Sequence, residues 1–143
     1  MKKSILLING PNLNLLGTRE PEVYGSNTLS DLEKICIEHA HSLDMDLDVF
    51  QSNYEGAIVE AVQQSKGKFS HIVMNPGAYT HTSIAIRDAI IAVEAQVWEV
   101  HISDIHSREE FRHHSYISDI AQGVIMGRGI NGYKDAIDEI AAL

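Results

Sequence analysis

The sequence lacks the features that mark secreted and membrane-spanning proteins. Its one cysteine, Cys36, has no partner in the chain with which to form a disulfide bond. The apolar run at residues 5–8 follows Met1-Lys2-Lys3-Ser4 and is too short for a signal peptide or a membrane span. We therefore expect a protein of the reducing cytoplasm.

Basic residues are also scarce. Eleven lysines and arginines stand against twenty aspartates and glutamates, which gives a net charge of −9 with neutral histidines. Such a charge repels nucleic acids and anionic membranes, so neither is expected as a partner. No repeat and no linker rich in Pro, Gly or Ser divides the 143 residues. The length suits one hydrophobic core, and we expect a single domain over residues 1–143.

Apolar runs alternate with helical periodicities along the chain. Short apolar or partly alternating runs predict strands at residues 5–8, 47–51, 71–74, 97–102 and 124–126. Helical spacing predicts four helices: one from Thr28 with a Thr28 to Asp31 capping pattern, one ending near residue 66, one over 84–93 and one over 133–143. The inward face of the third helix is expected at Ile84, Ala85, Ala89, Ile90 and Val93. This order predicts a three-layer α/β, flavodoxin-like fold with a five-stranded parallel sheet in the order 2-1-3-4-5.

The predicted fold indicates where a ligand binds. Ligands of open α/β sheets lie beyond the carboxyl ends of the strands, here at loops 10–27 and 75–82 and at the segment from His101. The first loop is long and holds Arg19 and Tyr24, as a lid does. Five of the eight histidines and three of the five arginines lie within residues 81–114, namely His81, Arg87, His101, His106, Arg108, Arg112, His113 and His114.

Several chemistries fit these loops poorly. A phosphate cradle at residues 10–17 is disfavoured against a packed loop, because Pro11 lacks an N–H and three leucines add bulk without donors. A receiver-type site needs an aspartate where the third strand ends in Asn75. The five-residue spacing of His101 and His106 matches no compact zinc pattern, so histidines with ordinary hydrogen bonds are favoured over a metal site.

Covalent catalysis also has little support. No serine sits in a nucleophile elbow, and Cys36 lies on the apolar stripe of the first helix, where a buried structural thiol is expected. The lysines lie at the terminus, on helices or in turns, so a Schiff-base lysine has no evident place.

Proton transfer remains, with a base and an acid on separate loops. Arg19 near Tyr24 would lower the phenol's pKa from about 10 and favour a tyrosinate base, the alternatives being a packed loop aromatic and a solvated arginine. Glu99 lies two residues before His101 on the same strand face, where it can orient the ring and raise its pKa toward that of a general acid. A core histidine with one backbone hydrogen bond is the alternative.

Three ordered motifs stand at the three loops. They are GPNLNLLGTREPEVYG at residues 10–25, NPGAYTHTSIAIRDA at 75–89 and EVHISDIHSREEFRHHSY at 99–116. These motifs resemble the type II 3-dehydroquinate dehydratases of the shikimate pathway, which leads to chorismate and aromatic amino acids. The resemblance covers nearly the whole chain and implies a single catalytic domain. Departures such as Pro76 and Ser107 remove no functional side chain.

The resemblance implies trans-dehydration of 3-dehydroquinate to 3-dehydroshikimate through an enolate, by a lyase without metal or cofactor. By motif, Tyr24 would be the base, Arg19 would keep Tyr24 ionised, and His101 would protonate the departing hydroxyl. Asn12 would hold a water at the enolate oxygen, and Glu99 would support His101. The residues implied for substrate binding are Asn75, His81, Asp88, His101, Ile102, Ser103 and Arg112.

The resemblance also implies an oligomer. In relatives the residue matching Asp88 reaches a neighbour's site across a trimer interface, and four trimers form a homododecamer. The competing hypothesis is a flavodoxin-like module that binds a small anion without turning it over, in which Arg19 and Tyr24 only clamp the ligand.

Overall fold

The protein is described by a computed structural model that covers residues 2–18, 22 and 26–143. Its centre is a five-stranded sheet in the order β2-β1-β3-β4-β5, in which every neighbouring pair is parallel. The strands are β1 (Ser4–Asn9), β2 (Asp46–Gln51), β3 (His71–Asn75), β4 (Val97–His101) and β5 (Gly123–Met126). The predicted fold class and strand order are confirmed.

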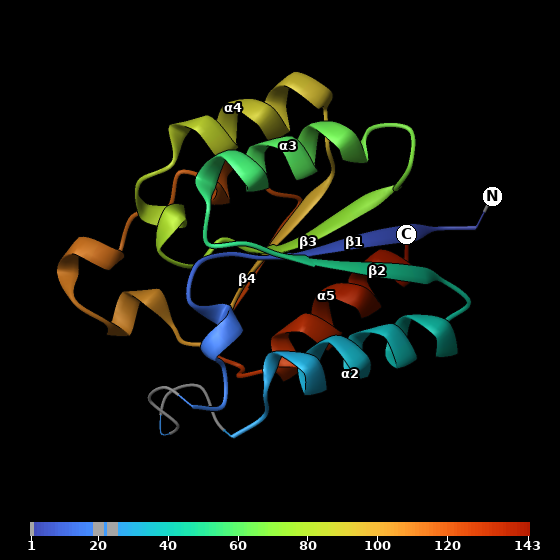
Figure 1. Cartoon of the computed structure of the whole chain (residues 1–143), viewed down its shortest axis with the longest axis horizontal. Coiled ribbons are helices and arrows are strands. Elements are labelled where there is room, and N and C mark those ends of the chain that lie inside the picture. Colours follow the sequence, from blue (N-terminus) through green and yellow to red (C-terminus); the bar gives the residue numbers. More distant parts are fainter. Residues whose placement is uncertain (1, 19–21, 23–25) are drawn as a thin grey trace.

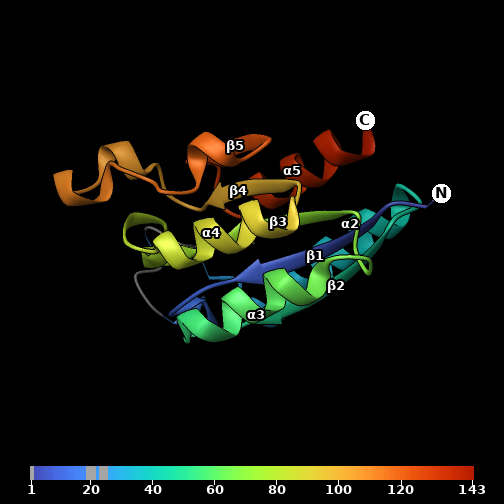
Figure 2. The same ribbon diagram turned by 90° about the horizontal axis from the view of Figure 1, so that it is seen from above.

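Helices cover both faces of this sheet (Figures 1 and 2). Helices α2 (Leu29–Ser42) and α5 (Asn131–Ala141) lie on one face and contact each other. Helices α3 (Glu55–Ser65) and α4 (Ile84–Val93) lie together on the other face. The three layers follow from the right-handed crossovers that join parallel strands.

The two faces explain why β1 is apolar without alternation. Ile5 and Leu7 belong to the core beneath α2 and α5, whereas Leu6 and Ile8 belong to the core beneath α3 and α4. Successive side chains of a strand point to opposite faces, so a central strand covered on both sides must be apolar at every position.

Local signals set the helix boundaries. Thr28 caps α2 in a capping box with Asp31, as predicted from the sequence. In α4 the predicted face was wrong at its start, because Ile84 is half exposed and Ala85 is exposed, whereas Ile86 is buried. Ser83 caps this helix through the N–H of Ile86. The stripe of 3.6-residue period that faces the sheet therefore starts at Ile86 and continues through Ala89, Ile90 and Val93.

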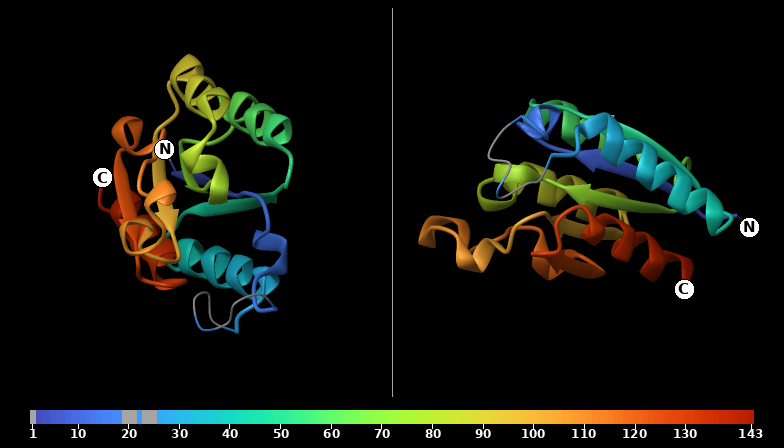
Figure 3. Two further views of the ribbon diagram at one scale, coloured as in Figure 1. Left: turned by 90° about the vertical axis from the view of Figure 1, so that its left-hand side faces the viewer. Right: turned by 90° about the horizontal axis from the view of Figure 1, so that it is seen from below.

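The carboxyl ends of the strands and the loops after them meet at one edge of the sheet, which faces the viewer in the left panel of Figure 3. Short 3-10 turns follow three of these strands: η1 (Leu13–Leu15), η2 (Gly77–His81), and η3 (Ile105–Ser107) with η4 (Glu110–Arg112) and η5 (Ser118–Ile120). Among the described residues, no helix is long and apolar enough to cross a membrane.

Candidate active site

A cavity lies at this edge of the sheet, among the loops after β1, β3 and β4. Its lining residues are Pro11, Asn12, Leu13, Asn75, Gly77, Ala78, His81, His101, Ile102, Ser103, Ile105, Arg108 and Arg112. The cavity is therefore where the predicted fold would place a ligand.

Most of the predicted site residues meet in this cavity. Asn12, Asn75, His81, His101, Ile102, Ser103 and Arg112 all line it. Glu99 lies behind His101 and has no exposed surface. Asp88 is exposed on α4 and does not line the cavity. Arg19 and Tyr24 lie outside the described residues.

Two glycines hold the first two loops together. The N–H of Gly10 donates to the carbonyl oxygen of Asn75 at 2.8 Å. A Cβ atom on Gly10 would lie 2.5 Å from the carbonyl oxygen of Pro76, closer than such atoms approach. On the second loop, Gly77 has a φ of +59° and packs against Pro11. Side chains at either position would separate the walls of the cavity.

Asn12 lies on the first loop in a left-handed conformation, with φ 71°. Asparagine tolerates this conformation better than most residues, because its short polar side chain bonds locally. The N–H of Asn12 donates to Oδ1 of Asn53 at 3.0 Å, which fixes the turn from the loop into η1. Its side chain is exposed at the cavity, where it can hold a water molecule or a substrate oxygen.

A buried chain of hydrogen bonds orients Asn75. Its Oδ1 accepts the N–H of Gly77 at 3.0 Å, and its Nδ2 donates to the hydroxyl of Tyr133 at 2.8 Å. The Tyr133 hydroxyl donates to Oδ1 of Asn9 at 2.7 Å. Tyr133 is fully buried, and burial raises its pKa, so the phenol keeps its proton. The amide of Asn75 is thus fixed with one Nδ2 hydrogen left for a ligand.

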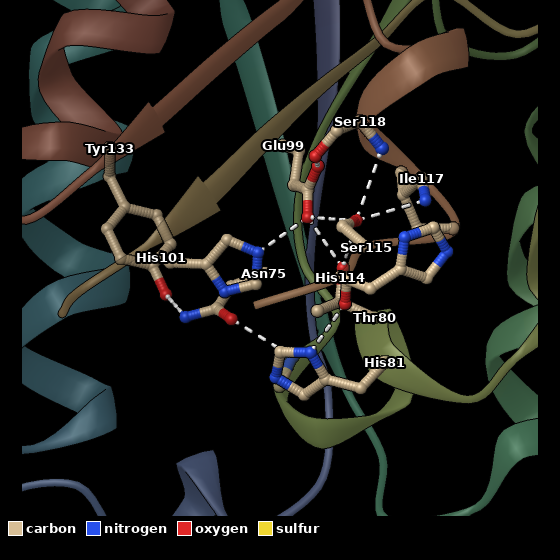
Figure 4. A network of polar contacts seen from close by, with 11 residues as sticks. Asn75, Thr80, His81, Glu99, His101, His114, Ser115, Ile117, Ser118 and Tyr133 are labelled. Atoms are coloured by element: carbon tan, nitrogen blue, oxygen red, sulfur yellow. Dashed lines mark hydrogen bonds and ion pairs between the residues drawn. The ribbon is translucent and has the colours of Figure 1, made fainter. Parts of the chain in front are cut away.

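His101 and Glu99 form a buried pair at the end of β4 (Figure 4). His101 Nε2 lies 2.6 Å from Glu99 Oε2. Burial raises the pKa of Glu99, but the hydrogen bond and charge of His101 and the hydrogen bonds from Ser118 and Thr80 together outweigh it. The resulting pKa of Glu99 is lowered to about 2. The ionised carboxylate accepts, so Nε2 of His101 donates and Nδ1 is the nitrogen that can meet a substrate.

His81 is the second histidine that lines the cavity. Its Nδ1 lies 2.8 Å from the carbonyl oxygen of His114, an acceptor, so Nδ1 donates. Burial lowers the pKa of His81, the carbonyl of His114 opposes this shift, and the charges of His101 and Arg112 lower the pKa further. A neutral His81 presents Nε2 as a hydrogen-bond acceptor.

Two arginines bring positive charge to the cavity. Arg112 Nε donates to Glu109 Oε1 at 3.0 Å. Arg108 Nη1 donates to the Ser103 hydroxyl at 3.2 Å. The sequence analysis did not select Arg108 for the site, although it lies within the third motif. The fold places Arg108 beside Ser103, a contact that sequence spacing alone did not reveal.

His106, His113 and Cys36 have structural environments. His113 Nε2 bonds the carbonyl oxygen of Arg108 at 2.9 Å, and the rings of His106 and His113 lie edge to face. Among the described residues, no group of three or more His, Cys, Asp or Glu side chains could hold a metal ion. Cys36 is fully buried, and burial raises the pKa of its thiol to about 12. Such a thiol is a poor nucleophile.

Comparisons with known proteins place this geometry in a family. The family model described as "Dehydroquinase class II" matches residues 3–141. The "Catabolic 3-dehydroquinase" of Emericella nidulans is 60% identical over 141 residues, covering 99% of this chain and 92% of that protein.

Solved structures agree with the sequence relatives. The type II dehydroquinase of Propionibacterium acnes superposes with a TM-score of 0.95 at 43% identity, covering 100% of this chain and 99% of that one. The type II dehydroquinase of Butyrivibrio crossotus also gives 0.95, at 45% identity and 97% coverage of both chains.

Proposed function

The chain belongs to the class II dehydroquinase family, and on this premise we propose how its cavity performs the family's reaction. That reaction is the dehydration of 3-dehydroquinate to 3-dehydroshikimate, and the protein is a hydro-lyase. The observation that carries the proposal is the buried Glu99–His101 pair, which ends at a cavity lined by polar groups.

His101 is the general acid. Ionised Glu99 accepts a hydrogen bond from the Nε2–H of His101, which leaves Nδ1 to protonate the departing hydroxyl. Glu99 does not itself line the cavity, so it acts through His101, which does.

Tyr24 is the base that removes the proton next to the ketone, and Arg19 keeps it ionised. This assignment rests on the motif at residues 10–25, since both residues lie outside the described part of the chain. Asn12 holds a water molecule against the enolate oxygen, where a fixed donor stabilises the charge as it develops. The chain itself supplies the acid and the base, so the proposal requires neither metal nor cofactor.

The substrate is an anion with several hydroxyl groups. The backbone of Ile102 and Ser103, with the Ser103 hydroxyl, receives the carboxylate. Asn75, His81 and Arg112 hydrogen-bond the ring hydroxyls. The left-over Nδ2 hydrogen of Asn75 and the acceptor Nε2 of His81 support this assignment, because hydroxyls both donate and accept.

The working unit is larger than one chain. Residues 1–143 form one catalytic domain, and trimers of it assemble into a dodecamer in which Asp88 serves a neighbour's site. The exposure of Asp88 on α4, away from its own cavity, supports this role. The single buried cysteine is consistent with a cytoplasmic protein.

A direct assay tests the function. Purified protein mixed with 3-dehydroquinate should produce the ultraviolet absorbance of the conjugated enone in the product. His101→Ala, checked for folding by circular dichroism, should lose most of this signal, by about 10²-fold or more in kcat. Binding of 3-dehydroquinate in calorimetry without any enone signal would instead support a non-catalytic binding module.

A further inference from the structure

Three hydroxyl side chains surround the carboxylate of Glu99 (Figure 4). Thr80 Oγ1 donates to Oε2 at 2.5 Å, Ser115 Oγ to Oε2 at 2.8 Å, and Ser118 Oγ to Oε1 at 2.5 Å. Thr80 belongs to η2, Ser118 opens η5, and Ser115 lies in the loop before η5. We call these three residues the hydroxyl cage. Together with His101 they give the buried carboxylate four hydrogen-bond donors.

The other contacts of Ser115 show that its hydroxyl acts as a donor within the cage. Ser115 Oγ accepts the N–H groups of Ile117 at 3.0 Å and Ser118 at 3.2 Å. A hydroxyl has two acceptor lone pairs and one hydrogen, so Ser115 Oγ acts as a donor on its remaining side, where Glu99 Oε2 and Thr80 Oγ1 both lie at 2.8 Å. Among the described residues, Ser118 is the one hydroxyl that bonds Oε1, whereas Thr80 and Ser115 share Oε2 with His101.

The charge of Glu99 depends on these donors. A carboxyl group without exposed surface prefers its neutral form, because burial removes the water that stabilises the anion. Donors to both oxygens reverse that preference. A neutral Glu99 would no longer require His101 to donate from Nε2.

We propose that Thr80, Ser115 and Ser118 are positioning residues, whose hydroxyls keep Glu99 ionised and so hold His101 with Nδ1 toward the substrate. This inference rests on the proposed function, in which His101 is the acid. Ser115 and Ser118 follow the segment that carries Arg108 and Arg112, so the cage connects the end of that segment to the Glu99–His101 pair.

Two other titratable groups near the pair belong to residues that a substitution in the cage leaves unchanged. They are His81 on η2 and Arg112 on η4, and the charges of His101, Arg112 and Glu99 all act on His81. Substitution of a cage hydroxyl therefore changes the donors of Glu99 without changing a formal charge.

The test begins with Ser118→Ala, Thr80→Val and their combination. We expect each single variant to lose about tenfold in kcat with KM within about twofold, and the double variant to lose more. When kcat is measured as a function of pH, its acid limb should move to higher pH in these variants, because Glu99 with fewer donors takes up a proton at higher pH. Ser118→Thr keeps a hydroxyl at this position, so its kcat and the position of its acid limb should be close to those of the unmodified protein.

Ser65→Ala is the matched control. It removes a buried hydroxyl that bonds the carbonyl oxygen of Val62 on α3, and it should change neither kcat nor the acid limb.

A double-mutant cycle separates this effect from the titration of Tyr24. Glu99→Gln has no carboxylate to titrate, so adding Ser118→Ala to it should leave the acid limb where Glu99→Gln alone puts it. A limb that moves equally with and without the carboxylate would overturn the inference. The inference would also be overturned if the cage variants fold but the acid limb of their kcat profile does not move, even if kcat falls. Absence of turnover in the unmodified protein would instead refute the proposed function.

Discussion

At the scale of single residues, Glu99 links stability to chemistry. Its carboxylate is fully buried yet ionised, because three hydroxyls and His101 all donate to it. An ionised group this far from water is costly unless every lone pair finds a donor. The same contacts that permit the charge also fix His101. The orientation that the proposed acid needs is thereby set by interactions that the fold makes before any substrate binds.

This arrangement predicts how stability depends on pH. The pKa of Glu99 is about 2 in the folded protein against an ordinary 4.5. The folded state therefore favours the ionised form, and its stabilising effect is complete above about pH 4.5 and disappears as the pH falls toward 2. We expect Glu99→Gln to be less stable than the unmodified protein by roughly 3 kcal/mol at pH 7, with the difference closing between pH 4.5 and 2.

Urea unfolding followed by circular dichroism between pH 2.5 and 7 measures this difference. Glu38→Gln, which removes an exposed carboxylate on α2, is the control and should show little difference at any pH. A stability difference for Glu99→Gln that stays constant over this range would contradict the ionised state of Glu99.

At the scale of elements, the walls of the cavity depend on close contact between two loops. Gly10 approaches the backbone of Pro76 so closely that a methyl group would meet a carbonyl oxygen at 2.5 Å. The obstacle is backbone, which cannot rotate away as a side chain can. Asn12 and Asn75 stand on either side of this contact, so its geometry sets their separation.

We therefore expect Gly10→Ala to lower the free energy of unfolding by about 1–3 kcal/mol, because the loops must move apart. Its kcat should fall as well, because Asn12 and Asn75 shift with the loops. Gly56→Ala is the matched control: it lies in α3, and a methyl group there would meet nothing within 4 Å. That change should stabilise the protein by about 0.4–1 kcal/mol. Thermal unfolding with the enone assay measures both effects, and equal stability of the two variants would contradict the argument.

The sequence predicted the helices and strands well, but it did not show which distant residues meet around Glu99. The alternation of short apolar runs with helical periods predicted the strands and helices, since both signals are local, and the order 2-1-3-4-5 followed from the flavodoxin-like fold that this alternation favours. The cage was missed, because Thr80 is separated from Ser115 by 35 positions and no periodicity connects them. The predicted inward face of α4 was wrong at its start for a different reason. Ile84 and Ile86 are both apolar, and only packing decides which one is buried.

At the scale of the whole molecule, the net charge opposes the substrate. A protein of charge −9 repels an anion at long range, yet Arg108, Arg112 and two histidines line the cavity. Charges separated by more than about 8 Å in physiological salt are largely screened, so the local groups dominate once the substrate is near. Recognition therefore depends on hydrogen bonds inside the cavity rather than on steering from a distance.

The position of Asp88 bears on the proposed assembly of several chains. It is exposed on α4 and does not line the cavity of its own chain, so a role in the site requires a neighbouring subunit. We expect His101→Ala to be inactive and Asp88→Ala to have reduced activity when each is made alone. In mixed oligomers, a subunit with intact His101 can adjoin a subunit with intact Asp88.

Co-expression of the two variants with different affinity tags, followed by tandem purification, gives such mixed oligomers. Random pairing would restore up to about a quarter of the sites, because each site needs one subunit of each kind in a fixed order. Activity per site should therefore exceed the mean of the two single-variant oligomers. The control is a mixture of the two separately purified proteins without subunit exchange, which should give that mean. Mixed oligomers that do not exceed it would show that Asp88 serves no neighbouring site.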